Sequence, residues 1–539
     1  MSKQLTMLVV VLFFAMVAVA QRPLSNPQKA TFRISGKVTN AEDGQPLLNA
    51  EVYLARLPGP KGQESQLVDS EGRFSFSGLS AGKYALLAGK KGFLAQPFGA
   101  HEGYVIGIFV GPGLADPDLS LKLQPAGSIT GVVRGDDGAP VQGAKISLFC
   151  DQLLQGLRRT FLAMDTSTDG RGIYRFSHLP AGKYYLAVSA KTDFFSLGRV
   201  IGSSVLLSHP WGPLPPDLDD VYPVTFFPNA TKAEAKQSFL LNAGQRLHAD
   251  FNLQSVPAMH IKIPAHAMPE FKMRAFQDED IDADSLLIPS DSQEWRMVLV
   301  APGRYATAME LCSDDGSCVT DSKQMDLSAD TTIDQKAMVE DHTEVHGTVV
   351  TDDGGPAARG SVLVLTPQRS ITMSKQIFIP IGDGGKIEWS GGIPRKRYAV
   401  EFHNPDRFLK SIAVEGAKFQ GSTIDVRGGS IHISLAVTDK AGQVRGKVLQ
   451  AGAPVAGAMV LLLPEDYQNN LQLVRRDESD SDGTFGLQPA PAGKYLAIAL
   501  QNGWDLEWAR PEVIKPYLAK AKSVSIAAGA TTEIILELQ

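Results

Sequence analysis

Apolar and polar residues alternate over short stretches along most of this chain. Val52 and Leu54, Phe74 and Phe76, and Tyr84 and Leu86 are apolar pairs of this kind, and Gly, Pro or Asp-Gly turns separate the stretches that contain them. Because alternate side chains of a β-strand point to the same face, each stretch predicts a strand with one buried side. Many short strands between turns predict an all-β fold of antiparallel β-sandwich modules with few short helices.

The same strands and turns recur in a fixed order. The first copy contains Ile34-Ser-Gly36-Lys-Val38, the turn Asp69-Ser-Glu-Gly72 and the segment Gly82-Lys83-Tyr84. Clear copies start at Ile129 and Val444, and two weaker copies lie between them. Each copy closes on a tyrosine, and these recur about every hundred residues: Tyr84, Tyr184, Tyr305, Tyr398 and Tyr495. A chain segment of this length can bury its own core, so we expect about five modules.

The repeat sets the expected domain boundaries. We assign a signal peptide to residues 1–20 and β-sandwich modules 1 to 5 to residues 29–124, 125–257, 258–341, 342–437 and 438–539, the third and fourth mainly by spacing. Module 2 carries an extension over residues 191–257, expected to be a strand-and-loop insertion packed on its sandwich, with a closing strand at 244–253. The short gaps between copies predict a stiff rod.

Two repeated motifs follow from backbone chemistry. In Asp-x-x-Gly or Asp-Gly, the carboxylate closes on its own backbone and the glycine accepts a positive φ. In Gly-Lys-Tyr, a tight turn leads into a strand, and we expect the tyrosine ring on the core and its hydroxyl on a backbone group. The acidic run from Asp477 to Gly483 contains the first motif, so a solvated turn is preferred to a calcium site, as it is for the acidic run at 278–284.

These repeated motifs resemble the carboxypeptidase regulatory-like domain, a transthyretin-like β-sandwich common in secreted bacterial proteins. The resemblance is clear for modules 1, 2 and 5 and weak for modules 3 and 4. It implies a seven-stranded sandwich related in shape to carbohydrate-binding modules, although shape alone does not imply binding. It does not imply peptidase activity, because catalysis in that family belongs to a separate zinc domain.

The N-terminal residues predict export. Lys3 precedes an apolar run over residues 5–20 that ends in Ala18-Val19-Ala20, the pattern of a cleaved secretory signal. A membrane anchor is the alternative, and the polar residues after Ala20 favour cleavage. No later stretch is long and apolar enough to span a bilayer as a helix. We therefore expect an exported chain, in the periplasm, on the cell surface or outside the cell, with no membrane span after cleavage.

Export makes a disulfide chemically accessible. Cys312 and Cys318 flank Ser-Asp-Asp-Gly-Ser, which predicts a hairpin whose three-residue loop ends at Gly316. In that register the two cysteines face each other at a separation that a disulfide accepts. We predict a structural disulfide, since a redox or metal pair lacks partner ligands nearby. Cys150 is expected to fill an apolar core.

Composition and charge narrow the function further. Of 539 residues, 43% are hydrophobic and 20% charged, and the formal net charge is −6. This composition is ordinary for a globular protein and argues against a nucleic-acid partner, which requires a basic face.

His342, Glu344 and His346 would lie on one face of a strand, and their side chains are of types that bind zinc. No fourth ligand is visible, so a solvated face is preferred. No catalytic or metal-binding residue is nominated, and no cofactor is expected.

Two tryptophans are the candidate ligand-binding residues. Trp504 and Trp508 would lie side by side on one helical turn, where sugar rings could stack on them. Val513, Ile514 and Tyr517 follow at near-helical spacing, so the preferred alternative is a short helix packed on the sandwich.

The sequence thus predicts a non-catalytic exported protein that presents surfaces to a polysaccharide or to envelope proteins. A purely structural or adhesion spacer of the cell envelope is an alternative with about equal support. A metal-dependent hydrolase that uses His342, Glu344 and His346 is the least supported alternative. The residues identify neither a ligand nor an oligomeric state.

Overall fold

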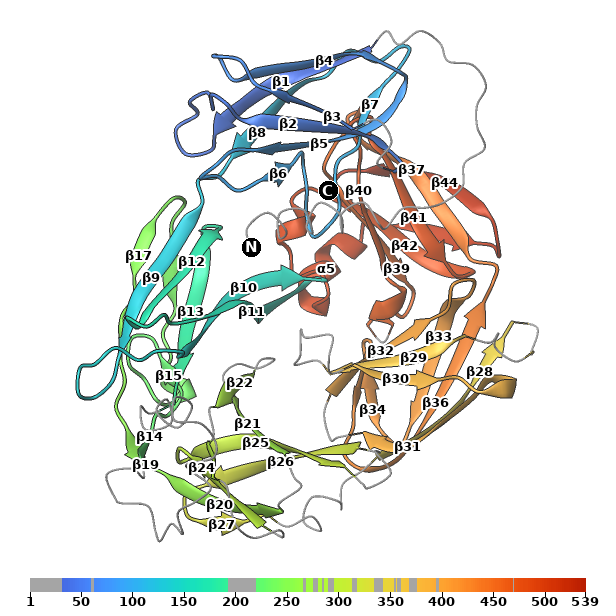
Figure 1. Ribbon diagram of the computed structural model, residues 1–539. Helices are drawn as coiled ribbons and strands as arrows, with labels where there is room; N and C mark the ends of the chain where they lie inside the picture. The colour runs from blue at the N-terminus through green and yellow to red at the C-terminus, as the bar shows by residue number, and fades with distance from the viewer. Residues whose placement is uncertain are drawn as a thin grey trace.

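Module 1 shows how the alternating pattern becomes a β-sandwich (Figure 1). One sheet has the strand order β4-β1-β8, and the other has the order β3-β2-β5-β6 with β7 also paired to β5. Ile34, Val38 and Leu54, on facing strands, are buried in the core between the sheets. The strands are β1 (Phe32–Asn40), β2 (Glu51–Leu57), β3 (Glu64–Leu67), β4 (Arg73–Leu79), β5 (Gly82–Gly89), β6 (Gln96–Pro97), β7 (Ile108–Val110) and β8 (Asp118–Leu123).

The computed structural model describes residues 32–59, 63–191, 220–264, 268–274, 280–283, 286–288, 295–312, 318–333, 343–352, 355, 360–367, 376–393, 397–468 and 470–539. Over these residues the chain is all-β with few short helices, as predicted. In each module the first strand pairs with an antiparallel neighbour and also with a parallel last strand, as β1 does with β4 and β8. The hairpin patterns did not predict the parallel pair, because it joins strands from opposite ends of a module.

Module 2 uses the predicted extension to complete its own sandwich. Of the extension, β15 and β16 pair with β13, while β17 and β18 pair with the first strand β9. Phe226 and Phe251 from these strands are fully buried, so the expected insertion is part of the core; β17 and β18 are the predicted closing strand. The elements are β9 (Gly127–Arg134), β10 (Lys145–Leu154), β11 (Leu157–Ser167), β12 (Ile173–Leu179), β13 (Gly182–Ser189), β14 (Asp220–Val221), β15 (Thr225–Phe226), η2 (Ala233–Ala235), β16 (Phe239–Leu241), β17 (Arg246–His248), β18 (Phe251–Asn252) and β19 (Val256–Pro257).

Modules 3 and 4 repeat the pairing. Module 3 shares a core with the outer face of module 2, where Phe149 and Phe226 pack with Ile261 and Phe271. Its strands are β20 (Met259–Pro264), β21 (Met268–Arg274), β22 (Asp280–Ala283), β23 (Leu286–Ile288), β24 (Trp295–Val300), β25 (Gly303–Cys312), β26 (Cys318–Leu327) and β27 (Thr331–Thr332). Module 4 comprises β28 (Thr343–Thr351), β29 (Val362–Pro367), β30 (Ile377–Pro380), η4 (Asp383–Gly385), β31 (Lys386–Ile393), β32 (Arg397–His403), β33 (Phe408–Glu415), β34 (Lys418–Gln420), β35 (Thr423–Asp425) and β36 (Gly429–Thr438).

Module 5 carries helical segments over the outer face of one of its sheets. A second apolar cluster there joins Leu461 and Ile498 of the sheet to Ile514 of α5. Pro511 starts that helix, at a position where its missing N–H costs nothing. The elements are β37 (Gly442–Gln450), β38 (Ala453–Pro454), β39 (Met459–Pro464), η5 (Leu471–Leu473), β40 (Arg475–Glu478), β41 (Thr484–Ala490), β42 (Gly493–Leu500), η6 (Gly503–Asp505), α5 (Pro511–Leu518), β43 (Lys522–Ile526) and β44 (Thr531–Glu537).

The repeated tyrosines lie where the motif predicts. The hydroxyls of Tyr84, Tyr184, Tyr305 and Tyr495 each donate to the carbonyl four residues earlier, at 2.7 to 2.9 Å. All five repeat tyrosines are buried, including Tyr398. All five rings therefore fill the core, and in these four modules the hydroxyl is satisfied at the tight turn before the strand.

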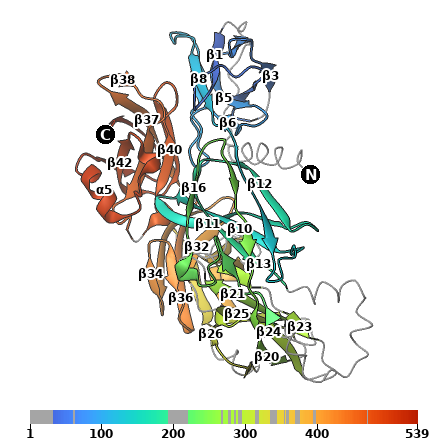
Figure 2. The same ribbon diagram turned by 90° about the vertical axis from the view of Figure 1, so that its left-hand side faces the viewer.

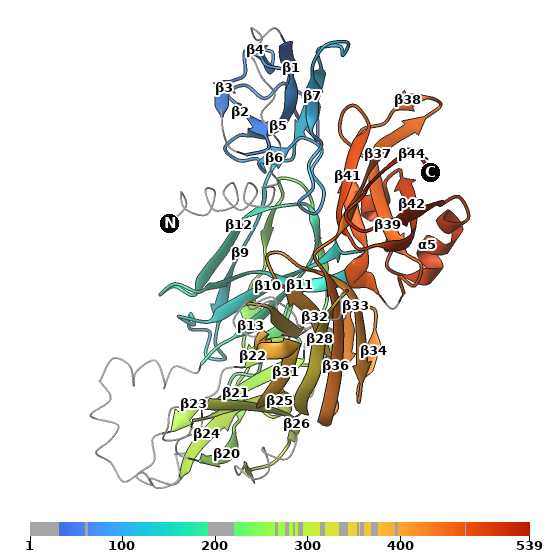
Figure 3. The ribbon, with the colours of Figure 1, turned by 90° about the vertical axis from the view of Figure 1, so that its right-hand side faces the viewer.

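The five modules form a ring (Figure 1). The chain passes from module 1 through modules 2, 3 and 4, and module 5 returns to lie beside module 1. The turned views show modules 4 and 5 on one side of modules 1 and 2 (Figures 2 and 3). The prediction of a stiff rod is therefore wrong, because it considered neighbours along the chain and not contacts between its first and last modules.

Candidate functional site

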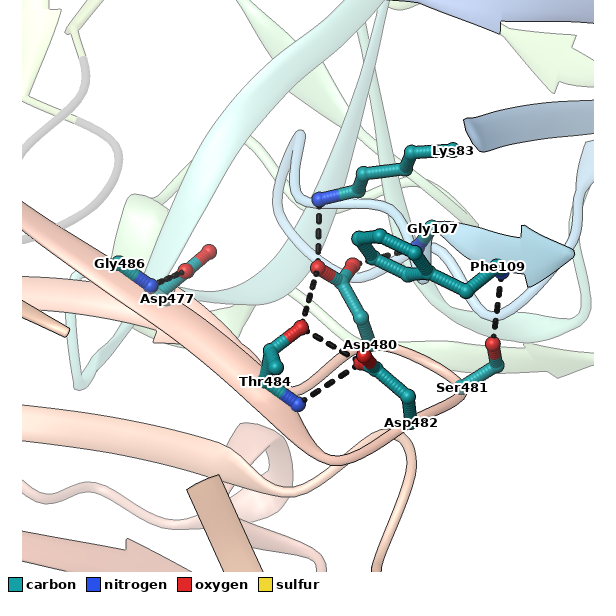
Figure 4. Close-up of polar contacts among 9 residues, drawn as sticks. All are labelled: Lys83, Gly107, Phe109, Asp477, Asp480, Ser481, Asp482, Thr484 and Gly486. Carbon is teal, nitrogen blue, oxygen red and sulfur yellow. Dashed lines mark hydrogen bonds and ion pairs between the residues drawn. The ribbon is translucent and has the colours of Figure 1, made fainter. Parts of the chain in front are cut away.

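The junction between modules 1 and 5 is the most elaborate polar site in the described part of the chain. A turn of module 5 inserts Asp480 into module 1 (Figure 4). Its Oδ2 accepts from Lys83 Nζ at 2.6 Å, and its Oδ1 accepts from the Gly107 backbone N–H at 2.7 Å. Ser481 joins the two backbones, since its N–H donates to Gly107 O and its Oγ accepts from Phe109 N–H. These contacts join distant parts of the sequence, since Lys83 and Asp480 are 397 residues apart.

Asp480 occupies a turn position at which the aspartates of modules 1 and 2 accept hydrogen bonds from their own turn. There, Asp69 and Asp169 each accept two backbone N–H groups of their own Asp-x-x-Gly turn. In module 5 it is Asp482, two residues later, that accepts a hydrogen bond from Thr484 N–H, at 3.1 Å. The additional carboxylate of the Asp-Ser-Asp-Gly turn thus leaves Asp480 free to bind module 1.

Gly107 leaves room for this approach. A Cβ on this residue would lie 1.8 Å from Lys83 Cε and 2.6 Å from Asp480 Oδ1. Real Cβ atoms are not found this close to other heavy atoms, so any side chain would displace one partner of the ion pair.

Two more charged pairs flank Asp480. His101 Nδ1 lies 2.8 Å from Oε1 of Glu478, whose side chain is fully buried. Arg476 donates to Glu102 at 2.7 Å, and both side chains are 12% exposed. Removal of one partner would leave a buried charge without its counterion, which is costly for Glu102, Arg476 and Glu478, whereas the His101 side chain is 44% exposed.

Burial controls the protonation of this cluster. It raises the pKa of Glu478, whose Oε2 has no hydrogen-bond partner, and it raises the pKa of Asp480 despite Lys83. Burial also raises the pKa of Asp477 to about 6. The hydrogen bond from His101 to Glu478 raises the pKa of the imidazole. The preference for a solvated turn at residues 477–483 is thus wrong, because module 1 covers Glu478 and Asp480.

The two candidate tryptophans belong to the same junction. Trp504 and Trp508 are 7% and 3% exposed, which leaves no open face for a sugar ring. The Arg476 guanidinium lies 5.8 Å and 5.4 Å from their rings, and His101 stacks on Trp504 at 5.4 Å and 5°. The two residues lie in and after η6 and do not share one helical turn. Both rings pack in the apolar cluster of module 5 with Ile514, as the preferred interpretation of the sequence predicts.

A hairpin of module 2 completes the junction. Gly156, between β10 and β11, accepts from Ala509 N–H at 3.2 Å, and Gln155 N–H donates to Glu102 at 3.1 Å. A Cβ on Gly156 would lie 2.5 Å from the ring of Trp508. Modules 1, 2 and 5 therefore meet at one place, where Figure 1 shows β10 and β11 reaching towards α5.

The cysteine register is as predicted. Cys312 pairs with Cys318 across β25 and β26, and the loop between them lies outside the described residues. The disulfide itself stays a prediction. Cys150 is buried with a free thiol in the core of module 2.

The possible zinc ligands do not form a metal site in the described part of the chain. His346 Nε2 contacts Glu344 Oε2 at 3.2 Å on an exposed strand face, and His342 lies outside the described residues. Over the described residues, no group of three His, Cys, Asp or Glu side chains is arranged to hold a metal ion. Residues 278, 279 and 284 of the other acidic run and the predicted signal also lie outside them.

No helix in the described ranges has the length and hydropathy to cross a bilayer.

Among family models, that of the carboxypeptidase regulatory-like domain matches residues 33–101 and 128–192. The resemblance inferred from the repeats is thus confirmed for modules 1 and 2. The fold and these matches define a multi-module β-sandwich protein that contains carboxypeptidase regulatory-like domains. A search of curated proteins finds no match to this chain.

Three bacterial proteins are among the solved structures with some similarity to this chain. The Bacillus anthracis TIE protein aligns over 95% of this chain and 76% of its own, at 9% identity and a TM-score of 0.16. The major pilin subunit BcpA of Bacillus cereus aligns over 76% and 99%, at 9% identity and 0.16. The minor pilin GBS52 of Streptococcus agalactiae aligns over 42% and 97%, at 12% identity and 0.20. Similarity at this level carries no functional argument.

Proposed function

We propose that this protein is a non-catalytic, exported scaffold of the cell envelope, whose ring holds several module surfaces in fixed relative positions. The junction of modules 1, 2 and 5 carries the proposal. A chain of independent spacers needs no contact between its ends, whereas here buried ion pairs, aromatic rings and backbone hydrogen bonds connect them. The regulatory-like domain matches agree with a role other than catalysis.

Ring closure gives a scaffold rigidity. An open series of modules bends at every linker, and relative domain motion is the default where interfaces are small. Closing the first and last modules on each other removes most of this freedom. Partners bound to different modules would then be held at constant separations, which makes rigidity useful for proteins or polymers of the envelope.

Replacement of the native gene by a variant with an open junction tests the proposal. Arg476→Ala with Asp480→Ala removes one ion pair on each side of Glu478. We expect the same envelope defect, for example sensitivity to detergent, as deletion of the gene, at unchanged amounts of exported protein. Asp69→Ala, which affects only a turn of module 1, is the matched control. Full complementation by the open-junction variant would contradict a scaffold role that depends on the ring.

A further inference from the structure

A cleft between modules 4 and 5 has features that the scaffold role does not use. It has a volume of about 620 Å³ and is lined mainly by the end of β32, the start of β33 and the segment between them in module 4, and by Gln472 and Arg475 of module 5. It is separate from the junction of modules 1, 2 and 5, where the neighbouring Arg476 lies.

Arg475 lacks an acidic partner. Its Nε donates to Pro489 O at 2.5 Å, and its Nη1 donates to the carbonyls of Gln472 and Val474 at 2.9 and 3.1 Å. Among the described residues no carboxylate forms an ion pair with it, in contrast to Arg476, which binds Glu102. Burial lowers the pKa of Arg475. A desolvated cation of this kind is stabilised when an anion enters its site.

Gln472 places an unused acceptor on the same wall. Its Oε1 is buried without a hydrogen-bond partner, although its Nε2 donates to Asn470 at 3.3 Å. A buried acceptor without a donor costs free energy until a ligand or water supplies one. The wall therefore offers a cation and an acceptor next to each other, which suits a ligand that carries a carboxylate and a hydroxyl group.

The opposite wall supplies apolar surface. Phe402 and Phe408 are partly buried and line the cleft from module 4, and Phe402 also packs against the core of that module. His403, which follows Phe402, is paired with Glu401 at 3.0 Å. Aromatic rings pack against the apolar faces of sugar rings while polar groups at the edge fix the hydroxyls. A peptide carboxylate would satisfy Arg475 equally well, but a sugar acid also explains the aromatic wall and the free acceptor.

We propose that the cleft between modules 4 and 5 binds a uronic acid residue of an acidic polysaccharide. Arg475 binds the sugar carboxylate, Gln472 accepts from a hydroxyl group, and Phe402 and Phe408 contact the ring. The site does not depend on the junction of modules 1, 2 and 5, so its loss leaves the proposed scaffold intact.

Titration of the full mature chain, residues 21–539, with oligogalacturonate by calorimetry tests this site. We expect binding that weakens as salt rises, and no binding of the methyl-esterified oligomer, which lacks the carboxylate charge. Arg475→Gln should weaken binding about tenfold or more, the range for loss of a charge-assisted hydrogen bond. Arg445→Gln, an exposed arginine of the same module, is the matched control and should bind as the wild type does.

Because Arg475 also holds three carbonyls, a second variant is needed. Phe408→Ala lies in module 4 and leaves those hydrogen bonds intact, and it should also weaken binding while the ring dimensions in solution stay unchanged. Equal binding of the esterified oligomer, wild-type affinity in Phe408→Ala and Arg475→Gln, or binding of polyglutamate but not of oligogalacturonate would each overturn the proposal.

Discussion

At the scale of single residues, small differences between modules determine where they join. Asp480 stands where Asp69 and Asp169 stand in modules 1 and 2, but it binds Lys83 and Gly107 of another module. In its own turn, the carboxylate that accepts from the Thr484 N–H is that of Asp482. The contact also depends on the absence of a side chain at Gly107, so one additional carboxylate and one glycine together convert a repeated turn into an interface.

Gly107→Ala should open this contact. The new Cβ would displace Lys83 or Asp480, because it would lie within 2.6 Å of both side chains. We expect a loss of about 1–3 kcal/mol from the junction, as for other overpacked sites. Hydrogen exchange of the loop at residues 99–109 should then become faster. Gly111→Ala is the control, because its Cβ would contact only Ala81 at 3.8 Å, and equal protection in both variants would contradict this account.

The pH dependence of the junction follows from His101. Hydrogen bonding to Glu478 raises its pKa, and Glu478, Asp505 and Glu102 all interact favourably with the protonated ring. A group whose pKa is raised by folding stabilises fully below its unfolded pKa, and that contribution is lost as pH rises through the raised value. The junction should therefore be weaker at pH 8.5 than at pH 5.5.

Solution scattering at these two pH values checks this direction. The radius of gyration of the wild type should increase with pH, and His101→Ala should remove most of the increase. Burial raises the pKa of Asp477 to about 6 and also raises those of Glu478 and Asp480, so these three carboxyls act in the same direction and account for the remainder. A smaller radius at pH 8.5 would contradict the assignment.

At the scale of elements, the sequence predicts what repeats. Strands, the tyrosine contacts and the register of Cys312 opposite Cys318 follow from local alternation and turn chemistry. The junction could not be predicted in this way, because Trp508 packs against Gly156 and Arg476 pairs with Glu102 across several hundred residues. The doubled aspartate in Asp480-Ser-Asp482-Gly483 was the one available signal, and it indicates a departure from the repeat without identifying the partner.

The hairpin of β25 and β26 should carry a disulfide in the exported protein. Directly opposed cysteines lie within the range that a disulfide accepts, and closing so short a loop contributes about 2 kcal/mol on the chain-entropy model. Alkylation of the denatured mature chain should label one thiol, that of Cys150, before reduction and all three afterwards. Labelling of three thiols without reduction would show that the pair is not oxidised.

At the scale of the whole molecule, the ring is the central feature. Modules 2 and 3 share one core, and modules 1, 2 and 5 meet through charged and aromatic side chains. The acidic-sugar cleft that we propose lies at another boundary, between modules 4 and 5. Surfaces between modules, and not the interior of any sandwich, therefore carry the features that distinguish this chain from a simple repeat.

Small-angle X-ray scattering of the mature monomer tests ring closure most directly. The wild type should give the pair-distance distribution of the closed ring, and Arg476→Ala with Asp480→Ala should give a larger maximum dimension because the junction loses its buried pairs. A wild-type profile of an extended series of five modules, unchanged in the double variant, would contradict the ring and the scaffold role built on it.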